Sequence, residues 1–140
     1  MAKKVLKNAY VALVGVDYSN HVASVTLNYD ADTQEATAMG DDTHGFLPGL
    51  KNWTAEIEFF NDYADNSIDE IAFAAIGAAN GTSVAIRPEN ATVSATNPEY
   101  QGTGVVTSHQ PVTGATGDIA KTKLSIVPYA GSDLVRDITP

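Results

Sequence analysis

The chain contains 140 residues, of which 44% are hydrophobic and 18% are charged, and its formal net charge is −9 at pH 7. This length corresponds to a single domain, since domains typically hold about 100–200 residues. The absence of cysteine excludes disulfide and thiol chemistry, the lack of a long apolar run excludes a helical membrane span, and the acidic balance excludes the basic footprint of a nucleic-acid-binding protein.

The N-terminal segment, residues 1–8, is the basic part of the chain, with lysines at positions 3, 4 and 7. No apolar stretch follows these lysines, so the segment lacks the pattern of a secretory signal peptide. We therefore expect an exposed arm on a cytoplasmic product. Residues 8–86, in contrast, carry twelve acidic residues and a single base, Lys51. Such acidity favours solubility, and it also suits a surface that faces a polyanion without binding it.

The next elements are predicted from apolar runs and from alternation. Residues 9–16 are apolar on both faces, which favours a buried strand. Residues 21–29 alternate between apolar and polar side chains, which is typical of a half-buried strand. A turn at 30–32 and a partner strand over 34–39 would complete a hairpin. Residues 40–51, rich in glycine and acids, predict a long loop whose exposed apolar residues dock on another surface.

The clearest strand pattern follows this loop. Every second residue from Trp53 to Phe59 is apolar, whereas Thr54, Glu56 and Glu58 between them are polar or acidic. This alternation predicts a strand with one face in the core and one wet, anionic face.

A helix is predicted over Ile68–Ala79. Ser67 and Glu70 have the spacing of a capping box, and the apolar residues that follow recur at helical intervals. The dipeptide Asn80-Gly81 is a stop signal.

Three more strands are expected, at residues 82–87, 100–108 and 121–127, and residues 128–140 are expected to form a C-terminal arm. The glycine pair at 102 and 104 predicts a bulge. About seven strands and one helix indicate a single mainly β domain over residues 1–140, built as a small sandwich or barrel with the helix laid against it.

No group of residues predicts catalysis or a cofactor. The segment Asp41–His44 offers oxygen and imidazole ligands, but it lacks the EF-hand pattern. Glu56 and Glu58 have a spacing that could serve glycoside hydrolysis, yet adjacent acids are also common on a wet strand face. We therefore expect no enzyme, no metal and no cofactor, which leaves a binding or structural role by elimination.

Four segments resemble the major tail tube proteins of long-tailed (siphovirus-type) bacteriophages. They are Val16–Leu27 with its Val-Asp-x-Ser-x-His opening, Thr37–Asp42 with Met-Gly-Asp-Asp, Gly49–Trp53 with Gly-Leu-Lys-x-Trp, and Ser94–Gly102 with Ser-Ala-Thr-Asn-Pro-Glu-Tyr. The four segments follow one another in the family's order, and the resemblance as a whole covers most of the chain, roughly residues 8–127. The resemblance implies a β-sandwich or half-barrel that assembles as hexameric rings, which stack into a hollow tube for DNA ejection.

Particular residues receive expected roles from this resemblance. The long loop is expected to reach the adjacent ring through Asp41, Asp42, Phe46, Leu47 and Leu50. A negatively charged lumen is expected to be lined by Ser24, Thr26, Asn28, Thr54, Glu56 and Glu58. The N-terminal arm is expected to meet the acidic body of a neighbour through Lys3, Lys4 and Lys7. For the six residues expected to line the lumen, a position on the outer surface is an equally good interpretation of the pattern.

The resemblance also implies partners and a location. The chain would associate with itself and with tape-measure, baseplate and tail-terminator proteins, and DNA would be a repelled cargo. It would be made in the bacterial host cytoplasm and would reside in the virion tail, with no membrane partner. Two alternatives stay open: another ring-forming part of a tail or injection machine, such as a terminator or secretion tube, and a monomeric β-sandwich binding module.

Overall fold

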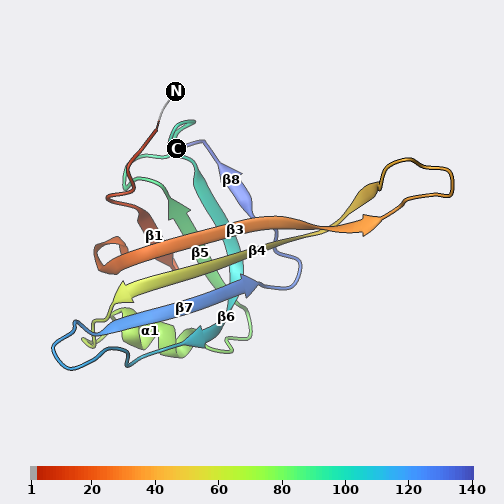
Figure 1. The fold of residues 1–140 in the computed structure, drawn as a ribbon. Coiled ribbons are helices and arrows are strands. Elements are labelled where there is room, and N and C mark those ends of the chain that lie inside the picture. The colour runs from red at the N-terminus through yellow and green to blue at the C-terminus, as the bar shows by residue number, and fades with distance from the viewer. Residues whose placement is uncertain (1–2) are drawn as a thin grey trace.

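The computed structural model describes residues 3–140, which form one antiparallel sheet and one α-helix (Figure 1). The strands are β1 (Tyr10–Leu13), β2 (Val16–Asp17), β3 (Val22–Glu35), β4 (Phe46–Phe60), β5 (Thr82–Arg87), β6 (Glu99–His109), β7 (Lys121–Pro128) and β8 (Val135–Asp137). The helix α1 covers Ile68–Ala75, and a 3₁₀ turn, η1, covers Ser19–His21. The prediction of a mainly β fold with one flanking helix is confirmed, with eight strands in this part of the chain.

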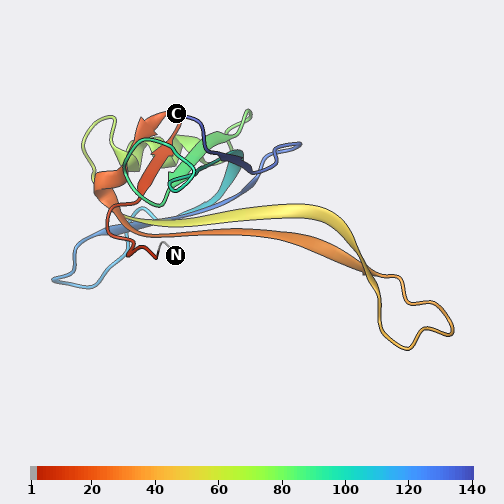
Figure 2. The ribbon, with the colours of Figure 1, turned by 90° about the horizontal axis from the view of Figure 1, so that it is seen from above.

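The sheet passes from one wall to the other at β6, whose two halves pair with different strands. Its strand order is β2-β1-β5-β6-β7-β4-β3, and β8 pairs with β6 outside this path. The first half of β6 pairs with β5 and β8, whereas its second half pairs with β7. The strands β3, β4 and β7 therefore form one wall of a half-barrel, and β1 and β5 lie in the opposite wall (Figures 1 and 2). Because β3 is the last strand in the order, one of its edges is unpaired.

The core lies between the two walls and is closed at one end by α1. The apolar face predicted for β4 is buried from Trp53 to Phe59, and it packs with the inward residues of the other strands. Burying each such large side chain stabilises the fold by about 1.5–3 kcal/mol. The helix contributes Ile68, Ala72 and Ala75, so its small residues let it approach the sheet closely.

Two glycines in β6 make room for Trp53. A Cβ atom at Gly102 would lie 2.7 Å from Cζ2 of Trp53, and a Cβ at Gly104 would clash with Ile126 and lie 3.1 Å from the indole. The bulge predicted at this glycine pair is wrong, because the pairing irregularity of β6 falls after Val106. The glycines are needed because a large ring packs against the backbone.

The helix is shorter than predicted. It ends at Ala75 instead of Ala79, because Ile76 has extended backbone angles (φ −61°, ψ 118°). Ile76 forms an isolated parallel bridge with Val106 of β6. Pairing with the sheet therefore takes precedence over one more helical turn.

The start of the helix agrees with the prediction, but its capping contacts differ. Ser67 is the N-cap residue, and its side chain makes no capping hydrogen bond. Glu70 reaches back one residue further than in a capping box, and its Oε2 accepts a hydrogen bond from the backbone N–H of Asn66 at 2.7 Å.

The largest difference from the sequence-based expectation is a long hairpin arm. The strands β3 and β4 continue past the body as a two-stranded ribbon (Figure 2). The turn expected at 30–32 and the separate strand over 34–39 are wrong, and residues 46–51 of the expected loop belong to β4. A bulge between Ala31 and Thr33 absorbs the irregular residues. Pro48 is tolerated because the ribbon has free edges.

The C-terminal segment is docked on the body. Within the expected arm 128–140, β8 pairs with the first residues of β6, with Glu99 opposite Asp137. The backbone N–H of Tyr129 donates to the carbonyl of Thr103 at 2.9 Å, and the N–H of Thr103 donates to Oγ of Ser132 at 2.9 Å. This segment therefore covers the first half of β6.

Candidate functional site

The tip of the hairpin arm is an ordered, exposed turn. Its strands are joined by residues 36–45, where Nδ1 of His44 lies 2.7 Å from Oε1 of Glu35 and the N–H of Gly45 donates to Oγ1 of Thr37 at 2.9 Å. Asp41 accepts a hydrogen bond from the N–H of Ala38 at 2.7 Å. The tip is thus held by its own hydrogen bonds, without support from the body.

The five residues predicted to contact an adjacent ring all lie on the outer part of this arm. Leu50 is 80% exposed, Leu47 60% and Phe46 59%. Asp41 and Asp42 are also exposed. The structure brings these residues together on one projecting element, and their contact role stays a prediction. Apolar side chains this exposed, so far from the core, indicate a surface that another molecule covers.

The arm is also strongly acidic. Residues 30–50 contain five Asp or Glu residues and no Lys or Arg. Residues 30–35 of β3 alone extend the ribbon by about 20 Å at the usual rise of about 3.3 Å per residue. The arm therefore presents apolar and anionic groups together, well away from the body.

The base of the arm is tied to the segment before β8. Tyr29 donates its hydroxyl hydrogen to Oδ1 of Asp133 at 2.9 Å, and Nζ of Lys51 lies 3.6 Å from Oδ2 of the same carboxylate. The hydrogen bond from Tyr29 is the main reason that the pKa of Asp133 lies below its ordinary value. Nε1 of Trp53 donates to the carbonyl of Ser132 at 3.3 Å. These contacts set the direction in which the arm leaves the body.

The six residues predicted to line a lumen share one face of the β3–β4 wall. They form three directly opposite pairs, which are Ser24 with Glu58, Thr26 with Glu56 and Asn28 with Thr54. This face points away from the core, because the alternate residues of β4 are buried. The grouping follows from the register, and the lumen role itself stays a prediction.

The same face carries cations that the sequence analysis did not place there. Lys123 of β7 lies opposite Glu58, and Nζ of Lys121 lies 3.4 Å from Oε1 of Glu58. The anionic strand face expected from β4 alone is therefore a surface of mixed charge. The alternation of residues 121–127 was visible in the sequence, but nothing there showed that β7 pairs with β4.

The N-terminal lysines differ in their surroundings. Nζ of Lys4 lies 3.0 Å from Oε2 of Glu89 and donates to the carbonyl of Thr96 at 3.1 Å, so it binds its own chain. Lys3 and Lys7 are exposed. The expected contact with a neighbour therefore falls on these two lysines more than on Lys4.

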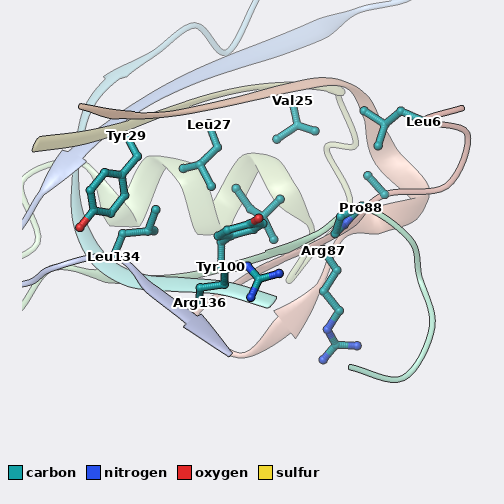
Figure 3. Close-up of a pocket in the computed structure, with 11 residues that line it drawn as sticks. Leu6, Val25, Leu27, Tyr29, Arg87, Pro88, Tyr100, Leu134 and Arg136 are labelled. Atoms are coloured by element: carbon teal, nitrogen blue, oxygen red, sulfur yellow. The ribbon is translucent and has the colours of Figure 1, made fainter. Parts of the chain in front are cut away.

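An apolar groove is a second feature that the sequence did not reveal. It has a volume of about 640 Å³ and lies between the inward face of β3 and the wall made by β5, β6 and β8. Figure 3 shows Val25, Leu27 and Tyr29 pointing from β3 toward Tyr100 and Leu134. Only the three-dimensional closure of the sheet brings these residues together.

A buried histidine lies between the helix and the sheet. The side chain of His109, at the end of β6, is 3% exposed, and its Nε2 lies 3.8 Å from Oδ1 of Asp69 in the first turn of α1. Burial lowers the pKa of His109, and the nearby Asp69 carboxylate opposes this shift. Neither ring nitrogen has a hydrogen-bond partner among the described residues.

Residues 3–140 contain neither a cluster of metal-ligating side chains nor a helix of membrane-spanning character. No group of three or more His, Asp or Glu side chains there could hold a metal ion. In the same residues, no helix combines the length and the hydropathy needed to cross a membrane.

Comparison with known proteins identifies the fold. No protein-family profile and no curated protein sequence matches the chain. A chain of the native gene transfer agent virion matches with a TM-score of 0.74 and 14% identity, covering 95% of this chain and 99% of that one. A chain in the structure of the sheath/tube terminator of an extracellular contractile injection system (PVC) matches with a TM-score of 0.72 and 13% identity, covering 96% of this chain and 98% of that one.

A chain in the structure of the tube-terminating cap of the anti-feeding prophage is similar as well, with a TM-score of 0.66, 12% identity, and coverage of 97% of this chain and 94% of that one. At such identities these matches show a shared fold. The fold is one found in chains of virion and injection-system assemblies, and it extends over nearly the whole of this chain.

Proposed function

We propose that this chain is a structural subunit of a phage-tail-type tube, which assembles head to tail as stacked rings. The observation that carries the proposal is the projecting arm with its exposed Phe46, Leu47 and Leu50. In the proposed assembly, a different surface of the next subunit covers this projecting surface. Such a heterologous contact closes into rings or continues as an open filament.

The unpaired edge of β3 supports ring formation. A long free edge is an aggregation hazard unless another chain or element covers it, and here it extends along a strand of fourteen residues. Lateral association of subunits in a ring would cover this edge. The resemblance of the sequence to tail tube proteins sets the expected ring at six subunits.

In this proposal the polar face of β3, β4 and β7 lines the lumen. The face has Glu56 and Glu58 beside Lys121 and Lys123, so its charges nearly balance. It offers no continuous row of cations for phosphate groups, and DNA could pass without the counterion release that drives tight binding. The low affinity for DNA would then come mainly from the absence of a row of cations. Electrostatic repulsion of the DNA by this face would be weaker than repulsion by a purely acidic face.

The proposed partners follow from this role. The chain would contact itself, a tape-measure protein in the lumen, and baseplate and terminator proteins at the two ends of the tube. Its location would be the tail of a virion, after synthesis in the bacterial host cytoplasm. No catalytic step is part of the proposal.

A tube-terminating ring is the second candidate function. It is favoured by the fold matches to chains in the structures of a sheath/tube terminator and of a tube-terminating cap. A terminator would form one ring and stop, whereas a tube subunit would continue to add rings.

Negative-stain electron microscopy at several protein concentrations, with light scattering in parallel, tests the proposal. Hollow tubes with a regular axial repeat are the expected result. Isolated rings that do not grow with concentration would favour the terminator. A chain that stays monomeric at high concentration, and that also fails to add to preformed tail tubes used as templates, would contradict both candidates.

A further inference from the structure

The apolar groove is open on the side where the sheet ends. Its floor and walls come from two parts of the fold, with Val25 and Leu27 on β3 and Tyr100 on β6 (Figure 3). Leu6 of the N-terminal segment lies at one end of the groove and Leu134 near the other. No strand follows β3 in the order of the sheet, so the described chain leaves this side uncovered.

The charged residues that line the groove are both cations. Arg87 and Arg136 are its charged lining residues, and no acidic side chain lines it. Arg87 is already paired with Glu99 and points away from the groove in Figure 3. Arg136 is exposed and has no ion-pair partner within residues 3–140. The groove therefore suits an occupant that is apolar and carries carboxylates.

The tip of the hairpin arm has this chemistry. Met39 is fully exposed, and Phe46 and Leu47 are more than half exposed. Asp42, in the turn that joins β3 and β4, makes no hydrogen bond or ion pair in the described chain. Apolar anchors with acids around them would fill the groove and meet Arg136 at its rim.

The arm cannot reach the groove of its own chain. β3 is continuous from Val25, in the groove, to Glu35, near the tip, and the paired ribbon projects away from the body (Figure 2). Bending the tip back would break the β3–β4 pairing. An arm from another copy meets no such constraint.

We infer that the groove between β3 and the β5–β6–β8 wall receives the arm tip of a second copy of this chain. The inference rests on the proposed head-to-tail assembly and names the surface that accepts the arm. Each copy gives one arm and accepts one, so every contact leaves a free arm at one end and a free groove at the other. The same contact repeated would produce an open stack of subunits.

Cross-linking between two single-cysteine variants tests the inference, since the natural chain has no cysteine. One variant carries Leu47→Cys at the arm tip, and the other carries Leu134→Cys or Leu6→Cys at the groove. The matched control is Phe73→Cys on α1, which is 74% exposed and outside the groove. The variants are mixed with a short bis-maleimide under assembly conditions, and linked peptides are identified by mass spectrometry.

The expected result is a hetero-linked dimer of Leu47→Cys with either groove variant, at a yield several-fold above that with Phe73→Cys. Micrographs of the same mixtures show separately whether the chain assembles. If rings or tubes form while the groove variants link no better than the control, the groove inference is overturned and the proposed function stands. If the chain neither assembles nor links, even when preformed tail tubes are supplied as templates, both are overturned.

A charge reversal gives a second readout on residues that do not support the core. Arg136→Glu should lower the yield of the hetero-linked dimer several-fold, and combining it with Asp42→Lys in the arm-bearing chain should restore part of that yield. Lys123→Glu, on the opposite face of the sheet, is the control and should leave the yield unchanged. Equal yields for Arg136→Glu and Lys123→Glu would overturn the assignment of Arg136 as the cation that meets the arm.

Discussion

The hydroxyl of Tyr29 donates a hydrogen bond to Oδ1 of Asp133 at 2.9 Å, and this bond joins the base of the hairpin arm to the segment before β8. The two residues are far apart in the sequence, so the contact exists only when the C-terminal segment is docked on β6. The direction of the arm and the docking of the chain end are thereby coupled. This coupling leads to the first prediction.

Tyr29→Phe should loosen the arm base without unfolding the body. The lost hydrogen bond is exposed, so the free energy of unfolding should fall by at most about 1 kcal/mol. Hydrogen exchange should instead rise several-fold at the amides of the arm base and the 129–134 segment. Tyr10→Phe is the control, because the Tyr10 hydroxyl has no hydrogen-bond partner in the described chain. Equal exchange in the two variants would show that the bond does not hold the arm.

Gly104→Ala should destabilise the fold. The added methyl group would clash with Ile126 and crowd the ring of Trp53. Overpacking of this kind costs about 1–3 kcal/mol, which urea denaturation can measure. Gly45→Ala is the matched control, since a Cβ at Gly45 has no atom within 4 Å. A Gly104→Ala variant as stable as Gly45→Ala would contradict the close packing of Trp53 on β6.

The stability of the fold should depend on pH through His109. Because burial lowers the pKa of His109 in the folded chain, the unfolded chain binds this proton more readily. The stability contributed by the neutral imidazole is complete above the ordinary histidine pKa of about 6.5 and is lost as the pH falls through the lower folded value. Urea denaturation of the natural chain between pH 8 and pH 5 should show this loss.

His109→Gln should remove most of that pH dependence, since glutamine does not titrate. His44→Gln is the control, because His44 lies exposed at the arm tip, outside the core. If His109→Gln and the natural chain lose stability in parallel between pH 7 and pH 5, another group is responsible.

The sequence predicted the core and the polar face better than it predicted the arm. Strict alternation from Trp53 to Phe59 fixes which residues face inward, and once β3 pairs in register the opposite face follows. The arm has no buried side, so no apolar alternation marks it. Asp30 and Pro48 are residue types typical of turns, so the sequence predicted turns or loops at these positions. In the structure both lie in the ribbon, which has free edges and a bulge between Ala31 and Thr33.

The groove and the mixed charge of the polar face could not be predicted for a different reason. Both depend on which strands become neighbours. Leu134 reaches the groove because β8 pairs with β6, and Lys123 meets Glu58 because β7 pairs with β4. Local periodicity carries no information about such long-range pairing, so these features appear only in the folded chain.

The paired substitution Leu47→Asp with Leu50→Asp should abolish assembly while preserving the fold. Both side chains are at least 60% exposed and lie outside the core, so stability should change by no more than about 0.5 kcal/mol. Light scattering should show subunits that no longer associate. Val112→Asp, at a residue 82% exposed on another loop, is the control and should assemble normally. Normal assembly of the arm variant would remove the central support for the proposed function.

The final prediction concerns the face that carries Glu56. In assembled tubes, Glu56→Cys should react with a small maleimide and should be protected from a protein-sized maleimide, because the tube wall shields the lumen from a folded protein that approaches from outside. Phe73→Cys should react with both reagents, since α1 lies on the core side of the β3–β4–β7 wall and so toward the outside of the tube. Unassembled subunits should react with both reagents at both positions, which shows that protection comes from assembly. If Glu56→Cys in intact tubes reacted with the large reagent as fast as Phe73→Cys, the polar face would lie on the outside, and the lumen would have to be lined by another part of the sheet.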